Sequence, residues 1–196
     1  MDLGYNFFKI DNKNLAPKKG KILIAEPFLN DSYFKRSIVF LTEHNEEGTV
    51  GFVLNKPVNL KLEEVVSELH AFHTQVSIGG PVGTNSLHYI HTLGDIIPES
   101  IHIIDNIYWG GEFESIKKIL NTGKINMNQI KFFLGYSGWQ PDQLSDELKE
   151  NSWIVSQLNT DKIMQTDTHG LWKETLSNLG KKYKIWSNFP EDPGLN

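Results

Sequence analysis

Five polar residues in the N-terminal third of the chain have the types and spacing of a ligand-binding group: Asp31, Arg36, Glu43, His44 and Asn55. Arg36 precedes one apolar run, Glu43 and His44 end it, and Asn55 ends the next run. The planar guanidinium of an arginine binds carboxylate and phosphate groups in a bidentate manner. The pattern therefore indicates a polar pocket for an anion at one rim of a sheet.

A hairpin formed by these two apolar runs places Arg36 and Asn55 at the same end. His44 then lies at the other end, about seven residues away at ~3.3 Å per residue. Trp139 and Gln143, near a glycine-rich turn, are candidates for the same pocket as Arg36. The simpler interpretation is that Arg36 pairs with Asp31 and that Asn55 caps strand ends. Both interpretations stay open, and the candidate ligand-binding residues are Asp31, Arg36, His44, Asn55, Trp139 and Gln143.

Three glycine-rich segments invite catalytic or phosphate-binding interpretations. Residues 135–139 (GYSGW) stand between a predicted strand and helix, but a nucleophile elbow needs glycine where Trp139 stands. Glu112 and Glu114 follow Gly110-Gly111 and would repel a phosphate. The segment 79–83 lacks the spacing of a dinucleotide loop and favours a turn with positive φ. We therefore expect no catalytic residue in these segments.

Metal and cofactor sites are not expected. The chain has no cysteine, which excludes thiolate chemistry and cysteine-based metal sites. Among its seven histidines, His70 and His73 share one face of a predicted helix, but no third ligand is close in sequence. His88 and His91 would point to opposite faces of a strand.

Charge and hydropathy limit the partners. The net charge is −5, and the lysines cluster only briefly, at residues 18–21 and 181–184. Direct DNA binding is therefore disfavoured, because phosphate neutralisation dominates such binding. No apolar run approaches the ~20 residues that span a bilayer, and the first residues lack the pattern of a secretory signal. We expect no membrane association and a cytoplasmic location.

Strand and helix patterns alternate without a strict βαβ rhythm, which predicts an α+β fold with a mixed sheet. Apolar runs predict strands, several of them covered on both faces, at 21–26, 37–43, 49–55, 76–78, 87–93, 101–104, 130–134 and 153–155. Helical spacing predicts helices at 62–72, 113–120, 141–148 and 172–179, the last followed by Gly180. The expected organisation is an N-terminal arm (1–19), one domain (20–185) and a loose tail (186–196).

Four segments, 20–55, 78–91 (IGGPVGTNSLHYIH), 108–120 (YWGGEFESIKKIL) and 132–155, together resemble the YqgE/AlgH family of bacterial proteins. Lys56 stands where that family often has arginine, and Ser137 where it often has alanine. The resemblance implies a cytosolic protein with one domain, in which a branched sheet curls into a small barrel flanked by helices. The family is described as one of candidate transcriptional regulators, and the resemblance implies no particular activity.

Two functions follow as hypotheses. The first is a non-catalytic regulatory or adaptor protein that acts through protein contacts, because no catalytic constellation is complete and several Trp and Tyr residues stand in turns. The alternative is a small anionic-ligand-binding protein, or an uncharacterised enzyme, with a pocket near Arg36, Asn55 and Trp139. The protein partner and the oligomeric state stay open.

Overall fold

The computed structural model describes residue 10, residues 15–69 and residues 72–191. The predicted N-terminal arm therefore lies largely outside the described residues, as does the end of the predicted tail. Ten strands form one sheet. They are β1 (Ile22–Ala25), β2 (Ile38–Asn45), β3 (Gly48–Val53), β4 (Pro57–Lys61), β5 (Gln75–Ile78), β6 (Val82–His91), β7 (Ile101–Ile104), β8 (Ile107–Trp109), β9 (Ile130–Trp139) and β10 (Trp153–Ser156).

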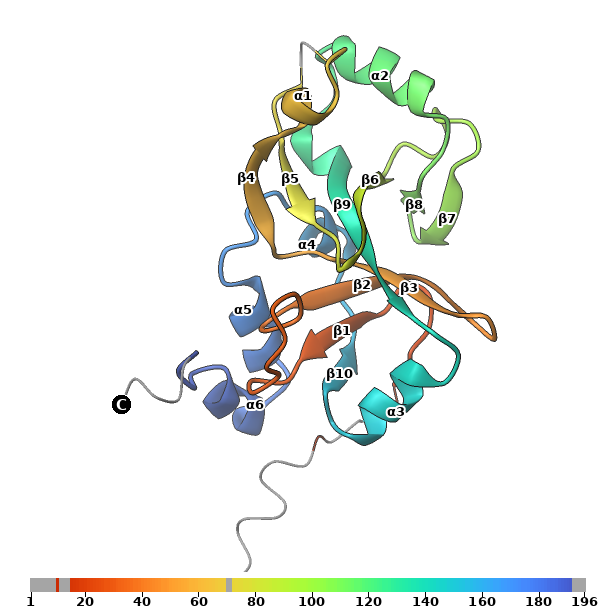
Figure 1. The fold of residues 1–196 in the computed structure, drawn as a ribbon. Coiled ribbons are helices and arrows are strands. Elements are labelled where there is room, and N and C mark those ends of the chain that lie inside the picture. Colours follow the sequence, from red (N-terminus) through yellow and green to blue (C-terminus); the bar gives the residue numbers. More distant parts are fainter. Residues whose placement is uncertain (1–9, 11–14, 70–71, 192–196) are drawn as a thin grey trace, which may run out of the picture.

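The helices lie around this sheet (Figure 1). They are α1 (Leu62–Val65), α2 (Phe113–Asn121), α3 (Gln143–Lys149), α4 (Thr160–Met164), α5 (Leu171–Ser177) and α6 (Lys181–Trp186), with a 3₁₀ turn at Met127–Gln129. In Figure 1, α1 and α2 accompany β4–β8, whereas α3, α5 and α6 accompany β1, β2, β3 and β10. The expected α+β fold in a single domain with a mixed sheet is confirmed.

Strand β9 joins the two halves of the sheet. Along one edge it pairs with β6, and along the other it pairs first with β5, in parallel, and then with β3. The strand order is β10-β1-β2-β3-β9-β6-β8-β7, and β4 and β5 branch from β9. Figure 1 shows β9 running from the half with β4–β8 into the half with β1–β3. The branch that the family resemblance implied is therefore present, and β9 creates it.

Glycines make this branch possible. The amide of Gly79 donates to Leu134 O, and the carbonyl of Gly79 accepts from Val53 N, so one residue bonds to both strands that flank the branch. A Cβ on Gly79 would lie 2.2 Å from Gly135 O, and one on Gly80 would lie 2.4 Å from Tyr136 O. Gly135 has φ +66°. These glycines thus allow the backbones of neighbouring strands to approach each other closely in the sheet. They do not form a phosphate-binding loop.

Alternating side chains of the central strands bury both faces of the sheet, as their nearly continuous apolar runs predicted. Ile22, Ile24 and Phe40 belong to a cluster that includes Trp172 and Leu176 of α5. Leu23, Ala25 and Val39 point the other way, into a cluster with Leu144 of α3. A third cluster lies under α2, where Ile116 and Leu120 pack on Ile130 and Phe132 of β9. In each cluster, apolar side chains of a helix and of the sheet bury each other from water, which stabilises the fold.

The expected small barrel is not supported. The sheet ends at β10 and β7, and the strand pairs of the described residues include none between these two ends. Ile103 of β7 and Ile107 of β8 share a core cluster with Ile22 of β1, so the two halves approach each other through side chains. At the β7 end Lys19 Nζ donates to His102 O at 3.1 Å. A side chain thus covers a polar group at an edge where barrel closure would need a strand.

Three local predictions were wrong. Helix α1 ends at Val65 instead of continuing to residue 72, because Val66 adopts an extended backbone (φ −124°), which suits a β-branched residue. The predicted turn at 135–139 is the second half of β9, which pairs with β3. Helix α5 ends at Ser177, and Gly180 is the N-cap residue of α6 instead of the residue that caps α5. The strand β4 was missed because it begins with a proline, which indicates a turn more often than a strand.

Candidate functional site

Asn55 connects the start of β2 to the residues that follow β3. Its Oδ1 accepts a hydrogen bond from Ile38 N at 2.8 Å, and its Nδ2 donates to Arg36 O at 2.9 Å. The predicted capping of strand ends by Asn55 is confirmed. The paired residues of β2 and β3 end at Val39 and Val53, so the amide supplies two backbone hydrogen bonds just beyond the end of this ladder. Asn55 thereby fixes the backbone at Arg36.

Arg36 occupies an unusual position. Its φ of 52° lies in the left-handed region, where a side chain is strained. The guanidinium carbon lies 5.0 Å from the centroid of the Trp172 ring, and Nη2 donates to Phe189 O at 2.6 Å. The indole of Trp172 is itself fixed, since its Nε1 donates to Ala25 O at 2.8 Å. Arg36 Nε is buried and makes no hydrogen bond with the described residues.

Arg36 and Asn55 line one cleft of about 560 Å³, which we call the Arg36 cleft. The segment between α4 and α5 forms its opposite wall, and the residues around it are Arg36, Asn55, Lys56, Pro57, Gln75, residues 166–173 and Glu191. Lys56 Nζ donates to Lys35 O at 2.8 Å. Burial lowers the pKa of the Lys56 amine, a shift that Glu191 opposes and Lys35 reinforces. Two half-buried cations therefore share the cleft, while its acidic residues, Asp167 and Glu191, are exposed.

Three of the other four candidate residues, His44, Trp139 and Gln143, lie at the opposite end of β3. His44 and Trp139 both pair with Thr49 in the sheet, and His44 Nδ1 lies 2.7 Å from Thr49 Oγ1. Trp139 Nε1 donates to Glu147 at 2.9 Å, and Gln143 Nε2 donates to the other oxygen of Glu147 at 3.0 Å. His44 lines a second cleft, of about 870 Å³, between the β2–β3 hairpin and α3. Trp139 therefore does not share a cleft with Arg36 and Asn55.

Asp31 has a local role. Its Oδ1 accepts from Tyr33 N at 2.8 Å and from Phe34 N at 2.9 Å, so it caps its own turn. The ion pair expected between Asp31 and Arg36 is not present among the described residues, because the guanidinium turns to Phe189 and Trp172 instead. Of the six candidates, only Arg36 and Asn55 come together at one cleft.

The structure gives the serine and histidine motifs structural roles. Ser137 is fully buried, and its Oγ donates to Gly79 O at 2.9 Å, so it belongs to the branch of the sheet. His91 is buried, accepts from Leu93 N and contacts Gly110 O at 2.8 Å, and burial lowers its pKa. His73 pairs with Glu63, while His70 lies outside the described residues. Across the described part of the chain, no three His, Asp or Glu residues gather to hold a metal ion.

Sequence reasoning missed Lys131. This residue of β9 is 8% exposed, and its Nζ donates to Gln165 O at 2.9 Å and to Ile163 O at 3.3 Å. Burial lowers the pKa of its amine to about 8. A lysine near the start of an apolar run is expected to be exposed at the end of the strand. The sequence pattern therefore does not predict that Lys131 is buried. Its hydrogen-bond partners come from the end of α4, so only the tertiary structure shows where its amine lies.

Similarity to other proteins defines the class. The AlgH-like family matches residues 22–184, so this chain belongs to the AlgH-like family. It is 47% identical to a UPF0301 protein of Parabacteroides distasonis, over 97% of this chain and 98% of that protein. It is 45% identical to a UPF0301 protein of Bacteroides fragilis over the full length of both.

Two solved structures share the fold. The protein DIP2367 of Corynebacterium diphtheriae aligns with a TM-score of 0.72 and 20% identity, over 89% of this chain and 94% of that one. The AlgH protein of Pseudomonas aeruginosa aligns with a TM-score of 0.69 and 24% identity, over 90% of this chain and 97% of that one. These similarities place the chain in a family whose function is unknown. Separately, none of the helices in the described residues is long and apolar enough to cross a membrane.

Proposed function

We propose that this protein binds a small anionic ligand, a carboxylate or a phosphate, in the Arg36 cleft. The observation that carries the proposal is the state of Arg36. Its guanidinium is held in place by Trp172 and Phe189, yet Nε is buried without a hydrogen bond among the described residues. An unsatisfied buried donor costs about 1–3 kcal/mol. A carboxylate or phosphate bound in the cleft would supply the counter-charge that this guanidinium lacks among the described residues.

The surroundings support an anion as the ligand. Lys56 adds a second half-buried cation. Desolvation lowers the pKa of its amine, and a bound negative charge nearby would stabilise the ammonium form and raise that pKa again. The positive φ of Arg36 is a local strain of the kind that clusters at binding sites. Asn55 holds that backbone in place. The cleft volume of about 560 Å³ suits a small metabolite.

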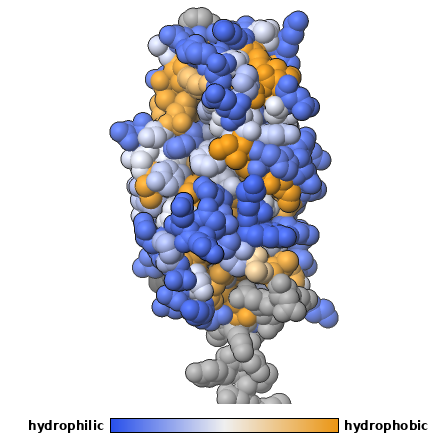
Figure 2. Space-filling view, turned by 90° about the vertical axis from the view of Figure 1, so that its right-hand side faces the viewer, coloured by the Kyte–Doolittle hydropathy of each residue, from blue (hydrophilic) through white to orange (hydrophobic). Residues whose placement is uncertain are grey.

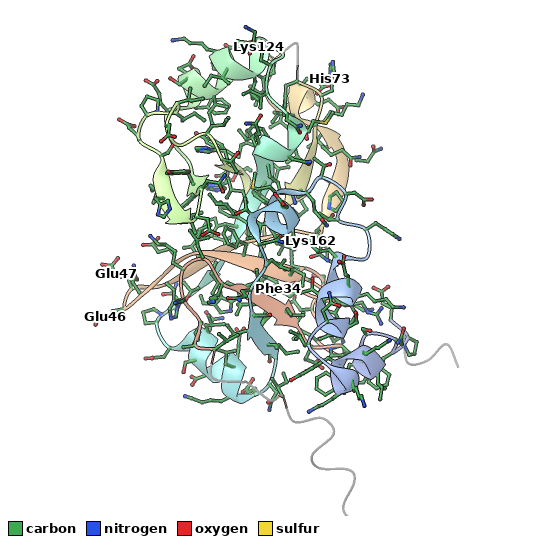
Figure 3. All side chains as sticks on the ribbon, turned by 180° about the vertical axis from the view of Figure 1, so that it is seen from behind. Phe34, Glu46, Glu47, His73, Lys124 and Lys162 are labelled. Atoms are coloured by element: carbon green, nitrogen blue, oxygen red, sulfur yellow. The ribbon has the colours of Figure 1, made fainter. Side chains whose placement is uncertain are left out.

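Calorimetric titration with inorganic phosphate and with succinate tests the proposal. We expect one of them to bind, and we expect Arg36→Met to weaken this binding at least about tenfold, because a fixed charged donor is lost. Lys124→Met is the matched control. It removes one positive charge at the end of the molecule beyond α2, where Figure 3 shows Lys124, and should leave binding unchanged. If neither anion binds, or if both variants behave like the unmodified protein, the proposal is wrong.

The regulatory or adaptor function through protein contacts stays a prediction. Two large apolar side chains are more than half exposed near the β7 edge, Ile96 at 59% and Ile101 at 52%. On the face shown in Figure 2, however, hydrophobic patches are separated by hydrophilic surface. A photo-crosslinking residue at Ile101 would test this function in cells. One reproducible partner, lost on Ile96→Lys, would support it, and labelling of no defined partner would contradict it.

A further inference from the structure

Lys131 is the one lysine that is buried among the described residues. Its Nζ reaches two backbone carbonyls at the end of α4, those of Ile163 and Gln165. No carboxylate of the described chain forms an ion pair with it, and desolvation is the cause of its lowered pKa. A buried ammonium without a counterion is costly, so burial raises the fraction of neutral amine, although with a pKa of about 8 the ammonium is still the larger fraction near neutral pH.

The hydrogen bonds fit the neutral amine as well. A neutral amine carries two N–H groups and one lone pair, whereas an ammonium carries three N–H groups and no lone pair. Two carbonyl oxygens accept from Nζ, at 2.9 and 3.3 Å. Both N–H groups of the neutral amine are therefore used, and its lone pair is left for another atom.

Lys131 lines a cavity of about 210 Å³, which we call the Lys131 cavity. Ser77 and Thr166 contribute hydroxyl groups to its lining. Pro57, Gln75 and Thr166 line both this cavity and the Arg36 cleft, so the two spaces are neighbours. A ligand with its anionic group at Arg36 would have to extend past these three shared residues to reach Lys131.

We propose that Lys131 is a reactive amine that forms an imine with a small aldehyde or ketone carrying a carboxylate or phosphate group. The inference rests on the proposed function, because the Arg36 cleft supplies the anion site, and it adds the class of ligand. The Nζ lone pair attacks the carbonyl carbon, and one amine proton moves to the carbonyl oxygen to give a carbinolamine. The carbinolamine then loses water, and a C=N bond replaces the C=O bond. No oxidant or reductant is required.

The expected reactivity follows from the protonation state. With a pKa of about 8 in place of 10.5, the neutral fraction of Lys131 near neutral pH is roughly 300-fold that of an ordinary lysine. A less basic amine is also less nucleophilic, which offsets about half of this gain on a logarithmic scale, as it does for thiols. We therefore expect Lys131 to react about tenfold faster than an exposed lysine.

Reductive trapping on the full chain tests the inference. The protein is incubated with glyoxylate, an aldehyde with a carboxylate, and sodium cyanoborohydride, which reduces the imine to a stable amine. Peptide mass spectrometry then compares labelling at Lys131 with labelling at Lys124, an exposed lysine of the same molecule. We expect about tenfold faster labelling of Lys131 near neutral pH. Equal or slower labelling of Lys131 would overturn the inference.

Acetaldehyde and the Arg36→Met variant separate this inference from the proposed function. Acetaldehyde has no anionic group, so it reports the amine alone. If the anion site is wrong but the amine is reactive, acetaldehyde labels Lys131 as well as glyoxylate does, and Arg36→Met changes nothing. If the amine is unreactive but the anion site is right, neither aldehyde labels Lys131, while glyoxylate still binds and loses affinity in Arg36→Met.

Discussion

Asn55 Nδ2 lies 2.9 Å from the backbone carbonyl oxygen of Arg36, and this contact ties the strained residue to the end of β3. The same amide accepts from Ile38 N at 2.8 Å. One side chain thus satisfies two backbone groups and positions the guanidinium that forms the proposed anion site. The stability of this corner and its ligand affinity are therefore linked through a single residue.

Asn55→Ala should lower the free energy of unfolding by about 2–3 kcal/mol, because it leaves a donor and an acceptor without partners. Asn55→Asp is the informative comparison. It keeps an oxygen for Ile38 N, so it should cost less stability, but its negative charge should abolish anion binding. Chemical denaturation and calorimetric titration measure the two effects. Equal stability of the alanine variant and the unmodified protein would contradict this role.

Arg36→Gly and Arg36→Ala should differ in stability although both remove the guanidinium. Glycine adopts a φ of 52° without strain, whereas alanine does not. We expect the glycine variant to be about 1 kcal/mol more stable than the alanine variant, and both to lose anion binding. Denaturant midpoints and titrations of the two proteins check this. A glycine variant less stable than the alanine variant would show that the left-handed backbone is not strained here.

Gly79→Ala should prevent normal folding, because the new Cβ would lie 2.2 Å from the backbone oxygen of Gly135, which cannot move without breaking the sheet branch. Gly138→Ala is the matched control, since its nearest neighbour is a Tyr136 ring carbon at 3.1 Å, which can shift. We expect the first variant to be largely insoluble and the second to be soluble. Yields of soluble protein and thermal unfolding compare them, and similar behaviour would contradict the steric argument.

Glu147→Ala should lower the free energy of unfolding by about 2–4 kcal/mol. Glu147 accepts from Trp139 Nε1 at 2.9 Å and from Trp153 Nε1 at 2.7 Å, so its removal strands two indole donors. Asp146→Ala, on the same helix, removes only an exposed pair with Lys149 and should cost at most about 0.5 kcal/mol. Tryptophan fluorescence during denaturation follows both, and equal losses would show that the indole contacts are unimportant.

Stability should rise with pH through Lys131. The folded pKa of its amine is about 8 and the ordinary value is 10.5. Between these values the unfolded chain binds more protons than the folded chain, so the free energy of unfolding increases with pH across this window. The rise should reach on the order of 3 kcal/mol, and Lys131→Met should remove it. Chemical denaturation of both proteins at several pH values measures the rise. The pKa shifts of Lys56 and Tyr89 are present in both proteins, so the difference between the two curves reports Lys131 alone. Parallel curves would refute the expectation.

The fold was predictable where apolar patterns were strong and local. The strands at 37–43 and 49–55 and the hairpin between them needed only alternation and a polar loop, and the structure pairs Asn45 with Gly48 as that pattern requires. Residues 135–139 are wrongly predicted as a turn, because glycine and serine favour turns when only the local sequence is considered. Their extended backbone depends on β3, which is about 85 residues away in sequence, and this pairing leaves no local trace.

The candidate site was predictable in part. Arg36 and Asn55 share a cleft because hairpin geometry alone places them at one end of the two strands. The pattern of residues 135–139 predicts a turn, and a turn there would bring Trp139 to the same pocket. Once that segment continues as a strand, Trp139 is carried to the end of β3 that holds Thr49. Lys131 could not be found, since its burial depends on a helix that follows it by about 30 residues.

Strand β9 has hydrogen-bonded neighbours in both halves of the sheet. Neither half can therefore open by itself without stripping one edge of this strand, so the molecule should lose its structure in a single cooperative transition. Amide hydrogens of β9 should exchange with solvent only through global unfolding, at the slowest rates in the chain. In this protein a substitution that destabilises β9 should therefore destabilise both halves of the sheet together.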